Sequence, residues 1–210
     1  MMEISETEQD AIVELFNMGM GQAAASLSAM VGGEVTLSIP HLEIKPSGQI
    51  AELDLVRRAE RICAVSEAFD GPFTGRALLI FPETSSLRIL RCLMPLPPDP
   101  HPLSDDEGEA LAEVGNIVLN GCLGCLANLM EMEIDGGVPS CRIGSPAQVF
   151  EGRASPFPVD EHVLFVRIDM GLADQGEGGH TLFVLDIGSV EAFLDAVRRF
   201  LSAQGPGGVG

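Results

Sequence analysis

The sequence predicts an α+β (mixed α/β) fold in which two similar halves form one domain around a largely antiparallel sheet. Polar residues recur at an offset of 99 residues, both halves run in the order helix, strands, hairpin and helix, and a proline-rich stretch separates them. Neither half alone covers both its apolar helix face and its sheet, so we expect the halves to join about a pseudo-two-fold axis. The expected domain spans residues 1–204, with repeats at 5–93 and 104–202.

Composition indicates a packed protein that does not bind nucleic acid. Hydrophobic residues make up 46% of the 210 residues, which is enough for a core. A formal charge of −19 argues against binding to the phosphate backbone of nucleic acids or to an anionic membrane, and the lack of Trp and Tyr argues against stacking on bases. The negative charge suits a partner protein that exposes Lys or Arg. We expect a cytoplasmic location, because the N-terminus is acidic, no apolar run approaches the ~20 residues of a membrane span, and the five cysteines are scattered.

Residues 5–31 are predicted to form a helix. Ser5 and Glu8 match a capping box, in which each side chain bonds a backbone N–H of the first turn. Gly32 and Gly33 end the helix. Between these signals, apolar residues recur every three or four positions, as on the buried face of a helix, and they are Ile12, Phe16, Met20, Ala23, Leu27 and Met30.

The rest of the first half reads as strands followed by a short helix. The turn signal Asp70-Gly71-Pro72 separates two apolar runs, which predicts a hairpin. The helix is expected at residues 85–94. The expected strands are residues 34–39, 42–44, 51–56, 62–69 and 76–81.

Residues 94–103 carry five prolines and are predicted to link the halves, because proline suits neither a helix interior nor a central strand. Ser104 is expected to cap a helix at 105–130. Residues 140–158 carry no clear pattern, and the Gly-rich tail at 205–210 is expected to be disordered. The remaining elements are strands at 133–138, 163–170 and 181–187, a loop at 171–180, and a helix at 189–202.

Each half contains an acidic residue, then Glu after three residues, Asn after two more and Pro after twenty-two more. At about 100° per residue, the polar members of each motif share one helix face that points away from the apolar stripe. We therefore expect two exposed ridges. The first ridge is Asp10, Glu14, Asn17 and Gly21, with Pro40 downstream; the second ridge is Glu109, Glu113, Asn116 and Asn120, with Pro139 downstream.

A carboxylate and an amide one helical turn apart can grip one small group together. The carboxylate can pair with a Lys, and the amide can donate and accept at once, so it can orient a water molecule. An amide is a poor base, but phosphoryl hydrolysis needs positioning more than a strong nucleophile. A single Glu-x2-Asn recurs by chance, whereas two in register, each with the same cap and proline, indicate function.

These residues resemble the motif of the CheC/CheX/FliY family of chemotaxis phosphatases, which is an Asp or Ser, then Glu, Asn and Pro at the same spacings. The first motif fits fully, and the second has Glu109 at the acidic position. The resemblance covers nearly all of residues 5–200. The presence of two motifs in one chain makes it more similar to CheC than to CheX, because CheX keeps only one active pair. FliY adds a flagellar-switch domain, and the chain is expected to end before one.

The resemblance implies dephosphorylation of a CheY-like response regulator that is phosphorylated on Asp and holds Mg²⁺ itself, so the chain needs no cofactor or metal of its own. Asn17 and Asn116 would place a water in line with the phosphorus. Glu14 and Glu113 would bind the active-site Lys of the regulator. The rest of the partner-binding surface would be Asp10, Gly21, Glu109 and Asn120. A CheD-like deamidase is a second partner that the family implies.

The two ridges are not identical. Asn120 replaces Gly21, and at the position before the catalytic Asn, Gly115 replaces Phe16. We therefore predict unequal sites, in which Asn120 either narrows the approach or adds a contact.

Two other functions stay open at this point. One is a non-enzymatic module that binds a response regulator or scaffolds a flagellar or signalling complex. The other is a thiol or metal protein built on Cys122 and Cys125. That C-x2-C lies within a helical pattern and has no second pair, which favours packing in the core.

Overall fold

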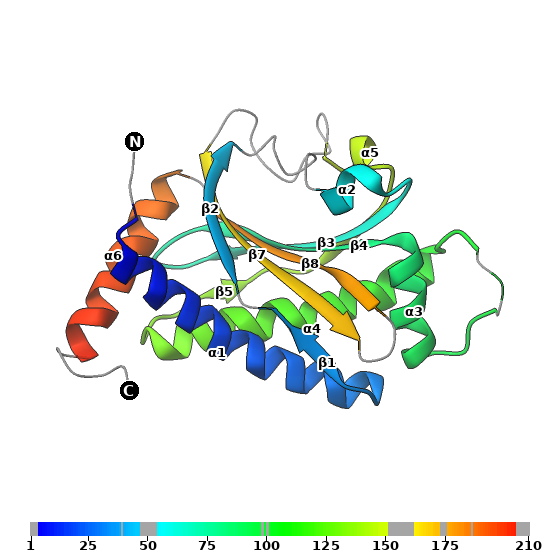
Figure 1. Cartoon of the computed structure of the whole chain (residues 1–210), viewed down its shortest axis with the longest axis horizontal. Helices are drawn as coiled ribbons and strands as arrows, with labels where there is room; N and C mark the ends of the chain where they lie inside the picture. The colour runs from blue at the N-terminus through cyan, green and yellow to red at the C-terminus, as the bar shows by residue number, and fades with distance from the viewer. Residues whose placement is uncertain are drawn as a thin grey trace.

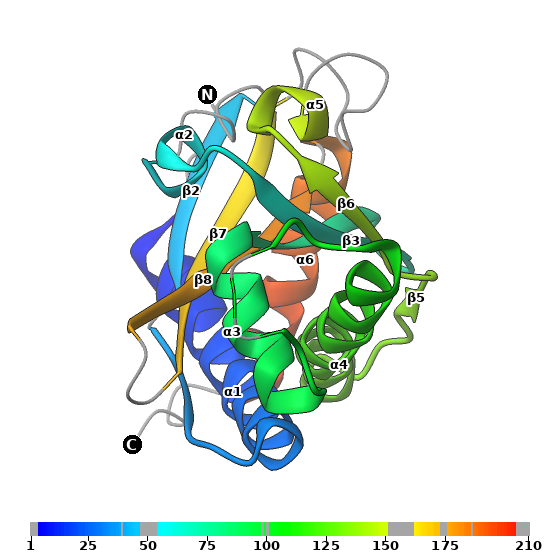
Figure 2. The ribbon, with the colours of Figure 1, turned by 90° about the vertical axis from the view of Figure 1, so that its right-hand side faces the viewer.

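The computed structural model describes residues 4–38, 40–46, 54–97, 99, 101–150, 162–172, 176–185 and 187–204, and its elements are labelled in Figures 1 and 2. The helices are α1 (Glu6–Val31), α2 (Asp54–Arg58), α3 (Glu83–Leu93), α4 (Asp105–Leu129), α5 (Pro146–Phe150) and α6 (Ile187–Gln204). The strands are β1 (Val35–Leu37), β2 (His41–Pro46), β3 (Ile62–Asp70), β4 (Gly75–Pro82), β5 (Asp135–Gly136), β6 (Ser140–Gly144), β7 (His162–Leu172) and β8 (Gly176–Leu185).

The described strands form one antiparallel sheet to which both halves contribute. Its order is β1-β7-β8-β4-β3-β5, with β2 also paired to β7 and β6 also paired to β3. The β3–β4 hairpin of the first half meets the β7–β8 hairpin of the second half where β4 pairs with β8. In addition, β1 and β2 pair with β7, whereas β5 and β6 pair with β3, so each half lends strands to the other. The predicted α+β fold with a largely antiparallel sheet is confirmed.

The helices lie on both sides of this sheet. In Figures 1 and 2, α1, α3 and α4 cover one face, α2 and α5 lie on the opposite side, and α6 lies at one end. The larger core fills the space between the sheet and α1, α3, α4 and α6. A smaller cluster on the opposite face contains Val56 of α2 and Val149 and Phe150 of α5. The polar face of each long helix is thereby left free.

Small residues let α1 and α4 approach closely. A Cβ added to Gly19 would lie 3.2 Å from Cys125 Cβ, and a Cβ added to Gly121 would lie 3.2 Å from Ala23 Cβ. Between these points, the Cys122 thiol lies 2.8 Å from the sulfur of Met20. Cys122 is buried, and burial raises the pKa of its thiol. Its predicted packing role in the core is confirmed.

Most predicted elements occur within one to three residues of their expected ends, but three expectations are wrong. Residues 54–56 belong to α2, because Val56 turns into the smaller core while the arginines that follow stay exposed. Most of the expected loop at 171–180 is strand, since β7 and β8 continue past a register shift at Met170 and Gly171. The expected strand at 133–138 is reduced to the two residues of β5.

Residues 140–158, which carry no clear sequence pattern, begin with β6 and α5. Residues 51–53, 151–158 and 173–175 and the expected disordered tail at 205–210 lie outside the described residues, as does Ile39. The pseudo-two-fold relation between the halves stays a prediction.

Among the described residues, α4 alone is long and apolar enough to cross a membrane by length and composition. This differs from the expectation that no apolar run reaches that length. The core helix of a soluble protein passes the same test, and α4 packs its apolar face on α1, β3 and β6. The length of α4 is thus weak evidence for a membrane.

Candidate functional site

The first ridge lies on α1, whose start is fixed by two sets of contacts. The Ser5 backbone N–H donates to Glu8 Oε2 at 2.8 Å, and Ser5 Oγ accepts from the Glu8 N–H, which completes the predicted capping box. The other Glu8 oxygen accepts from Arg198 Nε of α6 at 2.6 Å. The hydrogen bonds from Ser5, followed by Arg198, lower the pKa of Glu8. The ridge helix is therefore anchored to α6 at its N-terminus.

The second ridge lies on α4, which begins with the same device. Ser104 and Glu107 form a capping box, with the Ser104 N–H donating to Glu107 Oε2 at 2.7 Å. Here the outer partner is His101 of the linker, whose Nε2 lies 2.7 Å from Glu107 Oε1. This contact raises the pKa of His101. The linker thus contacts the capping Glu of α4 through His101, as α6 contacts the capping Glu of α1 through Arg198.

Both ridges face outward, as predicted. Asp10, Glu14 and Gly21 are exposed and Asn17 is half-buried on α1. On α4, the corresponding residues have the same exposure: Glu109, Glu113 and Asn120 are exposed, and Asn116 is half-buried. Each helix therefore offers two exposed carboxylates and one half-buried amide on a single solvent-facing surface, and α4 adds the exposed amide of Asn120. The roles of these side chains stay predictions.

The second ridge contains a contact that the first lacks. Asn120 Nδ2 donates a hydrogen bond to Asn116 Oδ1 at 2.6 Å. In the first ridge Gly21 has no side chain, and a Cβ added there would meet nothing within 4 Å. The predicted inequality of the ridges thus has a structural basis, because Asn116 is held by a neighbour and Asn17 has no equivalent one.

Phe16 and Gly115, at equivalent positions of the two helices, pack differently. Phe16 is buried in the core beneath α1. At Gly115, α4 passes so close to β3 that an added Cβ would collide with the Val65 side chain. The helix that carries the second ridge therefore lies directly on β3.

Glu67 of β3 is a buried carboxyl group that neither sequence motif contains. It is 0% exposed, and neither carboxyl oxygen has a hydrogen-bond partner in the described part of the chain. Burial raises its pKa to about 7. A Glu within the apolar run of residues 62–69 was the available signal, because a buried strand rarely carries a carboxylate without a partner.

Two large apolar side chains are exposed in the described structure, one beside the first ridge in the sequence and one beside the motif proline of the second half. Met18 follows Asn17 and is 48% exposed, while Val138 precedes the motif proline Pro139 and is 91% exposed. Such side chains are common where a protein meets a partner.

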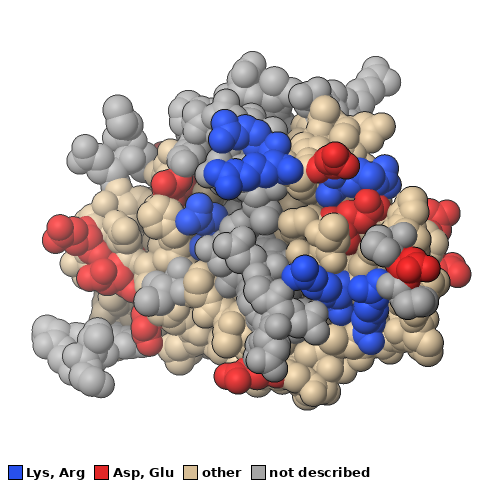
Figure 3. Space-filling model, turned by 45° about the vertical axis from the view of Figure 1, so that its right-hand side comes forward, with Lys and Arg blue, Asp and Glu red and all other residues tan. Residues whose placement is uncertain are grey.

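Charge is not spread evenly over the surface. Figure 3 shows basic and acidic side chains side by side on the face that carries α2 and α3, where Arg61 Nε pairs with Glu83 at 3.1 Å. The ridges, by contrast, carry carboxylates and amides and no basic residue. Within the described ranges, no three His, Cys, Asp or Glu side chains come together as a metal site would require.

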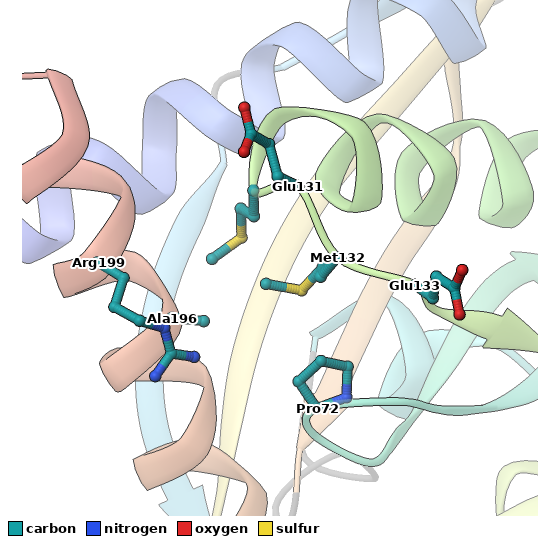
Figure 4. Close-up of a pocket in the computed structure, with 7 residues that line it drawn as sticks. Pro72, Glu131, Met132, Glu133, Ala196 and Arg199 are labelled. Carbon is teal, nitrogen blue, oxygen red and sulfur yellow. The ribbon is translucent and has the colours of Figure 1, made fainter.

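A pocket lies at the C-terminal end of α4, away from the ridge residues. Figure 4 shows Met132 pointing between Pro72 of the β3–β4 turn and Ala196 of α6, with Arg199 at one side. Glu131 and Glu133 also line it. None of the ridge residues contributes to its lining, so the pocket is separate from the predicted site.

Comparison with known proteins agrees with the motif. No family model matches the chain. CheY-P phosphatase CheC of Bacillus subtilis (strain 168) is 24% identical in an alignment of 207 positions that covers 94% of this chain and 97% of CheC. FliY of Thermotoga maritima has the same fold, with a TM-score of 0.77 at 17% identity over 95% of this chain and 100% of that chain.

A chain of the FliG–FliM complex of H. pylori also shares the fold, with a TM-score of 0.65 at 14% identity over 91% of this chain and 100% of that chain. The predicted resemblance to the CheC/CheX/FliY family is therefore confirmed, by sequence similarity to CheC along nearly the whole chain and by the fold that it shares with FliY.

Proposed function

We propose that this protein is a phosphatase that hydrolyses the aspartyl phosphate of a CheY-like response regulator. The observation that carries the proposal is the pair of outward-facing Glu–Asn sets, Glu14 with Asn17 on α1 and Glu113 with Asn116 on α4. The similarity to a protein named as a CheY-P phosphatase supports the same substrate class.

In the proposed reaction, one ridge docks over the phosphorylated Asp of the regulator. Glu14 or Glu113 accepts hydrogen bonds from a Lys of the regulator and sets the register. Asn17 or Asn116 donates to and accepts from one water, which holds it in line with the phosphorus. The water oxygen bonds to phosphorus as the bond to the Asp oxygen breaks, so the products are a free carboxylate and inorganic phosphate, and the water proton passes to phosphate or solvent. The Mg²⁺ of the regulator neutralises charge, and this chain supplies positioning.

The partner surface in this proposal extends beyond the catalytic pairs. Asp10, Gly21, Glu109 and Asn120 border the two pairs, and the exposed Met18 offers an apolar contact next to Asn17. The reaction takes place in the cytoplasm, as part of two-component signalling. A CheD-like deamidase is proposed as a second partner, and titration of the protein with such a deamidase checks that part separately.

The test is the lifetime of the phosphate on a purified CheY-like regulator, with and without this protein. We expect catalytic amounts of the protein to shorten that lifetime and to release inorganic phosphate over many turnovers. A lifetime that does not change at any protein concentration, with a regulator that is shown to bind, would contradict the proposal.

A non-enzymatic binding module is the second candidate. A chain of the FliG–FliM complex has the same fold, so the fold also occurs within an assembly of different proteins. The two functions differ in stoichiometry. A module that only sequesters the regulator would bind it in a one-to-one or two-to-one complex and leave the bound phosphate at its ordinary lifetime.

A further inference from the structure

In the second ridge a neighbouring side chain orients the catalytic amide, and the first ridge has no equivalent contact. Asn116 and Asn120 are one helical turn apart, and the 2.6 Å hydrogen bond from Asn120 Nδ2 fixes which end of the Asn116 amide meets its neighbour. Asn116 Oδ1 thus accepts one hydrogen bond from Asn120, while the NH₂ group of Asn116 stays available to donate to a water.

Glu67 reaches the same space beside Gly136 as the Asn120 side chain. On β3 it faces the helices, as do Val65 and Phe69 two residues away on either side. A Cβ added to Gly136 of β5 would collide with Glu67 Oε1 and would also lie 2.8 Å from Asn120 Oδ1. The carboxyl oxygen and the amide oxygen therefore converge on the same small space, which the absence of a side chain at Gly136 leaves open.

A carboxylate oxygen and an amide oxygen both accept hydrogen bonds, so with the Asn120 amide in this orientation a hydrogen bond between the two groups requires a proton on Glu67. A carboxylic acid supplies that proton when it is neutral. Burial raises the pKa of Glu67 to about 7, so the acid is largely neutral below neutral pH.

Other titratable groups around Glu67 do not provide a partner. On the same sheet face are Cys63 and Cys141 of β6, whose sulfurs lie 3.0 Å from each other. The neighbour on β4 is the uncharged Ala77, and the pairing of Asp135 with Asp70 places both on the other face of the sheet. From α4, Glu113 lies at the exposed surface. None of them bonds either oxygen of Glu67.

Building on the proposed function, we propose that Glu67 and Asn120 are positioning residues of the second site. Neutral Glu67 donates to Asn120 Oδ1, Asn120 Nδ2 donates to Asn116 Oδ1, and the chain of hydrogen bonds orients the Asn116 amide toward the in-line water. The first site has no such chain, because it has Gly21 in place of Asn120, and Val166, 99 residues after Glu67, is a core residue.

Ionisation of Glu67 reverses the direction of its hydrogen bond with Asn120. The carboxylate then accepts, so the Asn120 amide turns its NH₂ toward Glu67 and releases Asn116. Turnover at the second site therefore falls as the pH rises through about 7, whereas turnover at the first site does not follow this titration.

The kinetic test isolates each site in turn. Asn17→Ala leaves the second site, Asn116→Ala leaves the first, and dephosphorylation of the same regulator is measured from pH 6 to 8.5. The ratio of second-site to first-site rates removes the pH dependence of the regulator. We expect that ratio to fall about tenfold across this range, as the loss of one positioning hydrogen bond predicts.

Two further variants are made in the Asn17→Ala background. Glu67→Gln keeps an N–H donor toward Asn120 at every pH, so the ratio should become independent of pH. Asn120→Gly copies the first ridge and should lower second-site turnover about tenfold at pH 6. A Glu67→Gln variant that keeps the original pH profile, or an Asn120→Gly variant that keeps the full rate, would overturn the proposal.

A second measurement does not depend on catalysis. The side-chain amide resonances of Asn116 and Asn120 are followed by NMR in the free full-length protein as the pH is changed. Both should titrate together near pH 7, and neither should do so in Glu67→Gln. Amides that do not titrate would overturn the inference. Titrating amides in a protein that releases no phosphate from any regulator would instead remove the proposed function, and the catalytic role with it, while the hydrogen bonds stand.

Discussion

At the scale of single residues, Glu67 links pH to the stability of the fold. Its pKa of about 7 in the folded protein lies above the ordinary value of 4.5, so the folded state binds the proton more tightly than the unfolded chain does. The contribution of Glu67 to the free energy of unfolding should therefore be largest below pH 4.5 and should fall as the pH rises from 5 to 8. We expect a loss of about 2 kcal/mol, discounted for screening by solvent, in denaturant titrations.

The control for this prediction is Glu67→Gln, which cannot ionise and should lack this loss. Equal pH dependence in the parent protein and in Glu67→Gln would show that another group is responsible.

Gly115 tests the close contact of α4 with β3. Gly115→Ala would push a Cβ into Val65, so we expect a loss of about 1–3 kcal/mol in the free energy of unfolding. The matched control is Gly124→Ala on the same helix, where an added Cβ meets nothing within 4 Å. That variant should gain up to about 1 kcal/mol from helix propensity. Thermal or urea unfolding that ranks the two variants in the opposite order would contradict the described packing.

The sequence predicted the ridge residues because their evidence is local. Each ridge follows from spacing along one helix, and the repetition at 99 residues singles out its polar members. The part played by Glu67 could not be predicted in the same way. It depends on the path of β3 beneath α4 and on Gly136, which comes from a strand far along the chain.

At the scale of elements, the capping boxes hold the first turns of both ridge helices. Ser5→Ala and Ser104→Ala each remove an acceptor for a backbone N–H and a donor to Glu8 or Glu107. Each should lower the free energy of unfolding by about 1 kcal/mol, and Ser→Asp at either position should restore part of it. Chemical denaturation measures this effect. If neither alanine variant is destabilised, the caps contribute nothing to the fold.

Local signals explain which elements were predicted well. Caps, glycine stops and apolar periodicity set the ends of α1 and α4 almost to the residue. They failed at residues 54–58 and 171–180. At the first, burial of Val56 selects a helical turn from a pattern that also fits a strand. At the second, antiparallel partners supply hydrogen bonds to a glycine-rich stretch that reads as a loop.

At the scale of the whole molecule, the exchange of strands makes each half depend on the other. Strand β7 is flanked by β1 and β2 of the first half, and β3 is flanked by β5 and β6 of the second half. The repeat predicted two halves that join, but the sequence alone did not indicate that strands cross over between them. Pairing across such distances leaves no local signal in the chain.

This topology predicts that neither half folds alone. Fragments 1–97 and 98–210, expressed separately, would each expose unpaired strand edges and an uncovered helix face, so we expect no cooperative unfolding transition from either. Mixed in equal amounts, they should assemble and regain the circular dichroism spectrum of the intact chain. A single fragment that unfolds cooperatively would show that the halves are independent.

Both ridges are proposed to hydrolyse the phosphate, and replacing their asparagines singly and together tests this. The phosphate lifetime of a CheY-like regulator is measured with the parent protein, with Asn17→Ala and Asn116→Ala singly and together, and with Asn128→Ala as an exposed control on α4 outside the ridges. We predict that each single variant retains the activity of one site, that the double variant returns the lifetime to its unassisted value while still binding the regulator, and that the control matches the parent. Full activity in the double variant would show that neither asparagine takes part in hydrolysis.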